Sequence, residues 1–188
     1  MDSGTVLMWQ GYAAPSLEIA AVEVVDGCLS VRGTAIRAAP EPCTVSYRLE
    51  TGKRYETESL AIAAWGADWS RSLTLRRSAE GAWTADPGGR LSELDGALDC
   101  DIGYCCFTNT MPVLRHGLHS RVGTAELLVA WVSVPDLRVH ADRQRYRHLA
   151  RAGGGAVVRF ESGAFAADVE FDASGYVVDY PGLARRVR

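Results

Sequence analysis

The chain has no C-x-x-C spacing, and its five cysteines are an odd number for a framework of disulfides. Paired cysteines mark a disulfide scaffold, and two pairs of closely spaced ligands mark a structural zinc site. His116 and His119 are three residues apart, but no third ligand stands at a suitable spacing around them. We therefore expect reduced, packed thiols, no metal site and no cofactor.

Long apolar runs and clusters of basic residues are also missing. The most apolar run, residues 125–134, contains Glu126 and Ser133 and is far shorter than the ~20 residues that span a bilayer. Asp2 and the lack of a long apolar core make the N-terminal segment unlike a secretory signal. The net charge of −3 gives no driving force for nucleic-acid binding. We expect a cytoplasmic protein with no nucleic-acid partner and no integral membrane association, and the sequence predicts no oligomeric state.

Signatures of common enzymes do not occur. The chain has no G-x-S-x-G elbow, Walker A motif, dinucleotide fingerprint or recognisable Ser-His-Asp order. The glycine run at residues 153–155 is followed by neither Lys-Ser/Thr nor a helix start, which favours a hairpin loop over a phosphate site. No catalytic residue is therefore assigned from motifs.

What the sequence does have is alternation of apolar and polar residues with period two, which is typical of half-buried strands. Its 188 residues suit one domain, residues 1–188. Expected strands, separated by Gly, Asp and Ser turn signals, are residues 17–25, 28–37, 44–50, 55–65, 72–76, 125–134, 143–149, 157–160 and 165–171. Shorter strands are also expected at Trp9, at residues 99–101 and before Pro181. More than ten strands in all predict a mainly β fold with a large antiparallel sheet, which must curl, split or close.

One short helix is expected at Thr110–His116. Asn109 is a suitable N-cap, Pro112 is tolerated in the first turn, and Gly117 suits the position after the last turn. Two helical turns are unstable alone in water, so this helix should pack against the sheet. Residues 143–151 also fit a helical period, but we favour a strand there.

Two segments resemble the signature of a family of bacterial proteins described as "putative glycolipid-binding". Residues 94–102 read L-D-G-A-L-D-C-D-I, where the family typically has L-D-G-C-L-D-[IV]-D-[IL]. Residues 107–113 read F-T-N-T-M-P-V, similar to the family's F-T-N-T-L-P-I. Further similarities are Trp9, Asp26-Gly27, Gly33, Tyr47-x-Leu49, Gly81-x-Trp83, Trp131-Val132, Pro135-x-Leu137, Gln144-x-Tyr146, Asp179-Tyr180-Pro181-Gly182-Leu183 and Arg186-Val187.

This resemblance implies a spiral β-roll, in which a long, many-stranded antiparallel sheet wraps around a single short α-helix. It also implies binding of a glycolipid or another amphipathic molecule, a role inferred for the family from its shape. The chain departs from the family pattern at Cys105-Cys106, which replace T-P, and at Leu114-Arg115-His116, which replace R-R-L. One of two expected arginines is missing, which weakens the case for an arginine pair that grips an anionic head group.

Asp99 and Asp101 are two residues apart on an expected strand, so they share a face and lie roughly 6.6 Å apart along the backbone. They could accept hydrogen bonds from Arg115 or the backbone, bind a ligand head group, or act as an acid–base pair of the kind found in glycosidases. The candidate ligand-binding residues are Asp99, Asp101, Thr108, Asn109, Thr110, Arg115 and Trp131. Asp95, Gly96, Phe107, Pro112, Asp179, Tyr180, Pro181 and Gly182 are expected to serve the structure.

Three hypotheses follow. The leading one is a non-catalytic protein that binds an amphipathic, glycolipid-like ligand inside the roll, with Trp131 facing the interior. The second is a hydrolase of sugars or acyl esters that uses Asp99 and Asp101, or Cys106. The third is a structural or interaction module in which the helix fills the roll and leaves no cavity.

Overall fold

The computed structural model describes residues 4–187, and its strands form a single sheet of 15 strands. Along the sheet the order is β8-β7-β6-β5-β4-β3-β2-β1-β15-β14-β13-β12-β11-β10-β9. The first strand, β1, therefore pairs with the last strand, β15, in the middle of the sheet. The strands are β1 (Thr5–Gly11), β2 (Ser16–Val25), β3 (Cys28–Arg37), β4 (Cys43–Thr51), β5 (Thr57–Trp65), β6 (Ser70–Arg77), β7 (Trp83–Asp86), β8 (Gly89–Arg90), β9 (Asp99–Ile102), β10 (Thr124–Val132), β11 (Val139–Ala152), β12 (Gly155–Ser162), β13 (Phe165–Phe171), β14 (Val177–Tyr180) and β15 (Ala184–Arg186).

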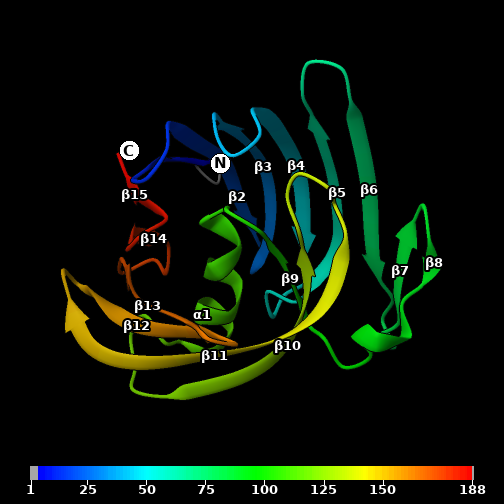
Figure 1. Cartoon of the computed structure of the whole chain (residues 1–188). Helices are drawn as coiled ribbons and strands as arrows, with labels where there is room; N and C mark the ends of the chain where they lie inside the picture. The colour runs from blue at the N-terminus through cyan, green and yellow to red at the C-terminus, as the bar shows by residue number, and fades with distance from the viewer. Residues whose placement is uncertain (1–3, 188) are drawn as a thin grey trace.

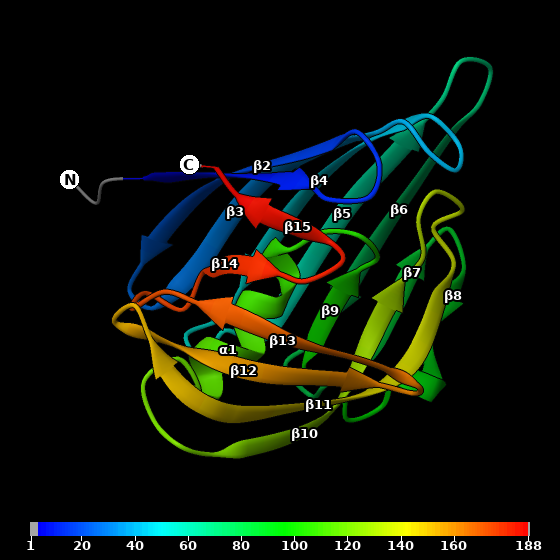
Figure 2. The ribbon, with the colours of Figure 1, turned by 60° about the vertical axis from the view of Figure 1, so that its left-hand side comes forward.

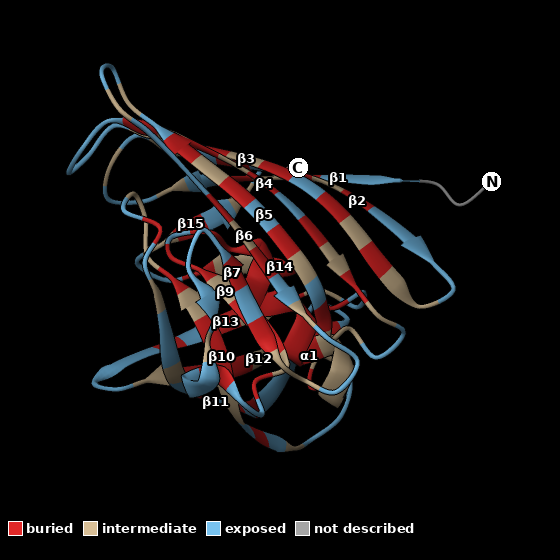
Figure 3. Ribbon diagram, turned by 90° about the vertical axis from the view of Figure 1, so that its right-hand side faces the viewer, coloured by how far each residue is buried: buried red, intermediate tan, exposed pale blue. Residues whose placement is uncertain are grey.

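The sheet coils around the short α-helix α1 (Thr110–His116), as the two ribbon views show (Figures 1 and 2). The β9 edge of the coil comes to lie against β5, where the Thr57 N–H donates to the Leu98 carbonyl at 2.8 Å and the Thr57 hydroxyl accepts from the Cys100 N–H at 3.0 Å, so the spiral roll is confirmed. Alternation along the strands places one face inside and the other in solvent, which appears as alternating colours in Figure 3. Val45, Tyr47 and Leu49 of β4 are buried, and Trp9 and Trp83 are fully enclosed.

The expectation of a wholly antiparallel sheet was wrong at one edge, because β9 pairs with β10 in parallel. Parallel neighbours need a long crossover connection. Here it is residues 103–123, which include the 3₁₀ turn η2 (Phe107–Asn109) and α1. A second 3₁₀ turn, η1 (Ser92–Leu94), precedes β9. The crossover carries the helix into the interior of the roll.

The helix has the expected bounds and the expected C-terminal end, where Gly117 adopts a φ of 65°. Asn109 occupies the expected N-cap position of α1, but the capping hydrogen bond is not formed. Asn109 is itself helical, makes no capping hydrogen bond, and donates from Nδ2 to the Tyr146 hydroxyl at 2.8 Å. The 3₁₀ turn η2 extends the helical segment backwards, so Asn109 no longer stands at its start.

The carboxylate of Glu18, on β2, takes the place of the cap. It accepts hydrogen bonds from the backbone N–H of Cys106 at 2.6 Å and that of Phe107 at 3.5 Å, and from the Tyr47 hydroxyl at 2.8 Å. These contacts satisfy backbone N–H groups at the start of the helical segment, which have no partner within it. Tyr47 reaches Glu18 across Gly33, where an added Cβ would lie 2.0 Å from the tyrosine ring. These contacts fasten the crossover to the first half of the sheet.

Two other expectations concern the second half of the chain and the cysteines. Residues 143–151 are part of β11, so the preference for a strand over a helix is confirmed. All five cysteines are free, and only Cys28 is not buried.

In the stretch from residue 4 to residue 187, no helix is long and apolar enough to cross a membrane.

Candidate functional site

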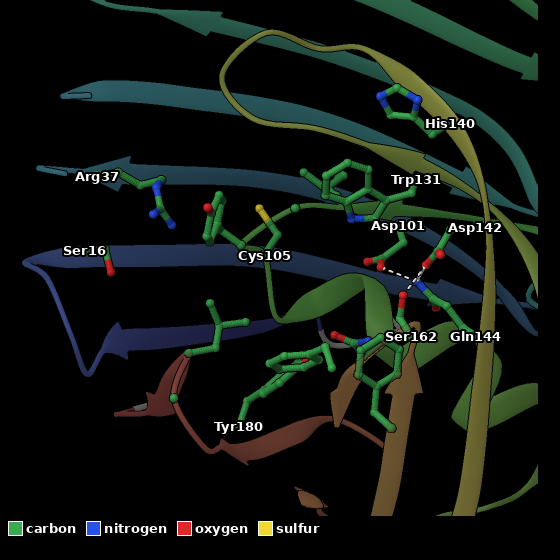
Figure 4. A pocket seen from close by; sticks show the side chains of 18 of the residues that line it. Ser16, Arg37, Asp101, Cys105, Trp131, His140, Asp142, Gln144, Ser162 and Tyr180 are labelled. Atoms are coloured by element: carbon green, nitrogen blue, oxygen red, sulfur yellow. Dashed lines mark hydrogen bonds between the residues drawn. The ribbon is translucent and has the colours of Figure 1, made fainter. Parts of the chain in front are cut away.

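A pocket of about 670 Å³ opens between the second half of the coiled sheet and the crossover that leads to α1 (Figure 4). This volume lies within the ~300–1,000 Å³ typical of ligand pockets. The lining residues come from distant parts of the chain and are Ala13, Ala14, Ser16, Arg37, Asp101, Ile102, Gly103, Tyr104, Cys105, Asn109, Trp131, His140, Ala141, Asp142, Gln144, Phe160, Ser162, Phe165, Tyr180, Gly182 and Leu183.

One wall of the pocket is polar and is built around the side-chain amide of Gln144. Its Nε2 donates to Asp101 Oδ2 at 2.8 Å and to Asp142 Oδ2 at 3.1 Å, so one nitrogen bridges two carboxylates (Figure 4). Thr108 donates to Asp101 at 2.6 Å, and Ser162 donates to Asp142 at 2.8 Å. We call Asp101, Asp142, Gln144 and Ser162 the polar wall. It draws its members from β9, β11 and β12.

The polar wall is held in place from behind. The hydroxyl of Tyr146 donates to Gln144 Oε1 at 3.2 Å and accepts a hydrogen bond from Asn109 at 2.8 Å. Because both hydrogens of the Gln144 amide and its oxygen are engaged, the orientation of the amide is defined. The network therefore joins the crossover to β11 and presents a preorganised set of donors and acceptors.

Burial changes the acidity of this wall. Desolvation raises the pKa of Asp101 to about 6, while the hydrogen bonds from Thr108 and Gln144 act in the opposite direction. Asp142 and the more distant Asp99 contribute further to the increase. Asp101 is therefore a carboxyl group that changes its charge near neutral pH.

The remaining walls are largely apolar and aromatic. The ring of Phe160 lies 5.1 Å from that of Tyr146 and 6.1 Å from those of Phe165 and Tyr180, measured between centroids. Trp131 lines the pocket beside the polar wall, since it is the register partner of Asp101. Together these surfaces give a cavity with one hydrogen-bonding side and an otherwise hydrophobic lining.

The mouth of the pocket lies where lining residues are exposed to solvent. Tyr104 and Phe165 are each about half exposed, at 50% and 51%. The guanidinium of Arg37 stacks on the Tyr104 ring at 3.6 Å from its centroid, a favourable cation–π geometry. The β1–β2, β12–β13 and β14–β15 connections gather at this same end of the roll (Figure 2). Large side chains thus border the entrance.

Three of the seven candidate ligand-binding residues, Asp101, Asn109 and Trp131, line the pocket. Thr108 lies behind Asp101 and positions its carboxylate. Thr110 is completely buried, and its hydroxyl has no hydrogen-bond partner.

The other two candidates, Asp99 and Arg115, pair with each other away from the pocket. Two guanidinium nitrogens of Arg115 donate to the two carboxylate oxygens of Asp99, and the side chains are 5% and 2% exposed. This is the structural alternative that the sequence suggested for Asp99. Desolvation raises the pKa of Asp99, and the arginine opposes that increase. Arg115 is consequently committed to a buried ion pair.

Sequence reasoning missed Asp142 and Ser162 and noted Gln144 only as part of a motif. A signal was present, because Gln144 and Tyr146 alternate along the predicted strand 143–149, and Asp142, directly before that strand, continues the same alternation and would share their face. An acid, an amide and a phenol on one face of a strand are unusual for a pure core. His140 and Arg37, which also line the pocket, carried no such signal.

A sequence model of the family described as "Putative glycolipid-binding" matches residues 6–186. The chain belongs to this family. Its structure is similar to a crystal structure of a DUF1089 family protein from Pseudomonas aeruginosa, with a TM-score of 0.75, 28% identity and coverage of 95% of both chains. A search of curated proteins found no match.

The family motifs occupy defined places in this structure. Gly96 and Gly182 have φ angles of 90° and 80°, which explains why glycine suits these turns. Phe107 is fully buried, and Pro112 is buried in the first turn of α1. Other motif residues lie near the surface. Asp95 pairs with Arg90 at 2.6 Å, and Asp179 accepts a hydrogen bond from Tyr12. Pro181 is exposed, and its neighbour Tyr180 lines the pocket.

Proposed function

We propose that this protein binds an amphipathic, glycolipid-like ligand in the pocket without transforming it. The observation that carries the proposal is the composition of the cavity, which combines a preorganised polar wall with an aromatic and aliphatic lining. An amphipathic molecule has the complementary division into a polar head and an apolar chain. The family description, which is "Putative glycolipid-binding", points in the same direction.

The apolar lining would supply most of the affinity. Burial of hydrocarbon contributes about 0.8 kcal/mol per methylene, so two more methylenes in the pocket should tighten binding by roughly 15-fold. This gain should stop when the chain fills the cavity. The polar wall would contribute orientation and specificity more than affinity.

The two other hypotheses from the sequence receive less support. A module packed solid would not have a cavity of about 670 Å³. Catalysis through Asp99 is disfavoured, because its carboxylate is paired with Arg115. Catalysis through Cys106 is disfavoured as well, because burial raises the pKa of its thiol well above the ordinary range and opposes formation of the thiolate. A single domain, a cytoplasmic location and the absence of a nucleic-acid partner remain predictions.

The test combines extraction with titration. Purified protein is extracted with organic solvent and the extract analysed by mass spectrometry, and a fluorescent fatty-acyl probe is titrated into the delipidated protein. Alkyl maltosides of increasing chain length then displace the probe. We expect saturable binding with one site per chain and an affinity that rises with chain length to a plateau.

A pair of variants locates the site. Ala13→Trp places a large ring on the pocket lining in the β1–β2 loop, whereas Ala173→Trp adds the same ring at an exposed turn outside the pocket. We expect the first variant to weaken probe binding at least tenfold and the second to leave it unchanged. Equal affinities in both variants, or no saturable binding by the unaltered protein, would refute the proposal.

A further inference from the structure

The polar wall holds two carboxylates that lack a cationic partner. None of the ion pairs found within residues 4–187 includes Asp101 or Asp142. Their hydrogen bonds come from neutral groups, namely the Gln144 amide and the hydroxyls of Thr108 and Ser162. The wall therefore carries negative charge that the protein does not neutralise locally.

Arg115, an arginine among the candidate ligand-binding residues, and Arg37, the arginine that lines the pocket, are both engaged elsewhere. Arg115 donates both of its terminal nitrogens to Asp99, outside the pocket. Arg37 lines the pocket at the side opposite Asp101, where it stacks on Tyr104 and donates to the Ala39 carbonyl at 3.2 Å (Figure 4). A phosphate or sulfate placed at the polar wall would thus face two carboxylates without an opposing cation. Like charges in a partly desolvated site repel strongly.

The wall retains capacity to accept hydrogen bonds. An ionised carboxylate offers about four lone-pair sites, and Asp101 and Asp142 each receive two side-chain hydrogen bonds. Hydroxyl groups of a ligand can donate to the remaining sites and can accept from water. The surroundings suit such a ligand, because amide, hydroxyl and carboxylate groups interleave along the wall.

We infer that the polar wall selects an amphipathic ligand whose head group carries hydroxyl donors and no net charge, and that it rejects an anionic head group. This inference rests on the proposed function, because it assigns a head-group chemistry to the same pocket. A cationic head group is the alternative that two carboxylates also allow. Against it, neutral donors already contact both carboxylates, and one amide nitrogen bridges them.

The experiment compares amphiphiles that share a dodecyl chain and differ only in the head. Dodecyl maltoside, dodecyl phosphate and dodecyltrimethylammonium displace the same fluorescent acyl probe at pH 8, below their micelle concentrations, while circular dichroism monitors the fold. We expect dodecyl maltoside to bind at least tenfold more tightly than either charged amphiphile. Equal or tighter binding of the phosphate or of the ammonium compound would overturn the inference while leaving lipid binding intact. Failure of all three to bind would overturn the proposed function as well.

Variants connect the selectivity to the wall. Asp142→Asn removes one charge with little change of shape, and we expect the preference for maltoside over phosphate to fall at least threefold. The double variant with Asp101→Asn should reduce it further, and the single variant keeps the test informative if the double variant does not fold. Asp168→Asn, at an exposed carboxylate of β13, is the control and should leave the ratio unchanged. An unaltered ratio in Asp142→Asn would overturn the assignment.

Discussion

Glu18 should make the stability of the protein depend on pH in a way that one substitution removes. Its carboxyl group is buried, and desolvation raises its pKa from 4.5 to about 7 despite hydrogen bonds from Cys106, Tyr47 and Phe107. Below pH 4.5 the carboxyl is protonated in both the folded and the unfolded chain. Between pH 4.5 and 7 the unfolded chain loses this proton while the folded chain keeps it, so stability falls as pH rises. Above pH 7 the carboxyl group is ionised in both states, and stability falls no further from this cause.

The size of this effect follows from the pKa difference. Each pKa unit corresponds to 1.36 kcal/mol, so a shift from 4.5 to about 7 gives roughly 3 kcal/mol. Glu18→Gln keeps the shape of the side chain and stays neutral at every pH. The free energy of unfolding of the unaltered protein, minus that of the variant, should therefore fall by about 3 kcal/mol between pH 4.5 and pH 8.

Urea unfolding followed by tryptophan fluorescence at several pH values measures this difference. Glu23→Gln is the matched control, because Glu23 lies on the same strand but is exposed and pairs with Arg32 at 3.2 Å between two solvated side chains. Exposed ion pairs contribute about 0–1 kcal/mol, so the free energy of unfolding of Glu23→Gln should change with pH in the same way as that of the unaltered protein. Parallel pH profiles for the unaltered protein and Glu18→Gln would refute the argument that burial raises the pKa of the Glu18 carboxyl group in the folded protein.

Three further predictions concern packing, charge and thiols. Gly33→Ala should destabilise the protein by about 1–3 kcal/mol in urea unfolding, because the new Cβ would lie 2.0 Å from the Tyr47 ring. Arg115→Met should cost about 3–5 kcal/mol, because it leaves the Asp99 carboxylate buried without its partner. In a titration with Ellman's reagent, Cys28 should react rapidly in the native protein and the four buried cysteines only after denaturation.

Each of these predictions has a control. Gly4→Ala meets no atom closer than 3.6 Å and should change stability little, so an equal loss at both glycines would contradict the packing argument. Arg32→Met breaks only the exposed pair with Glu23 and should cost less than about 1 kcal/mol. Rapid reaction of more than one thiol per native chain would show that the interior is more open than described.

Local patterns predicted the secondary structure well, because each signal acts over a few residues. Period-two alternation located strands such as β2, β3 and β13, and the combination of Pro112 and Gly117 located the helix with its observed bounds. The pairing of Asp99 with Arg115 was also within reach, since the two residues are only 16 positions apart and the sequence already suggested Arg115 as a hydrogen-bond donor to Asp99.

Asn109 makes no capping hydrogen bond, and the acceptor at the start of the helical segment is instead distant in sequence. Glu18 and Cys106 are 88 positions apart, and no spacing rule connects a strand residue near the start of the chain with a turn in its middle. The same holds for the parallel pairing of β9 with β10, which depends on where the crossover re-enters the sheet. In both cases a long-range contact decided between local alternatives.

The sequence by itself determined which segments become strands, which becomes the helix and which residues of a strand share a face, because backbone geometry sets these periods. It did not determine which faces meet. Asp101, Asp142, Gln144 and Ser162 come together only because the sheet coils and brings β9, β11 and β12 around one space. The 15-stranded sheet curves because its strands pack around the crossover. The pocket therefore depends on contacts between residues that are far apart in the sequence.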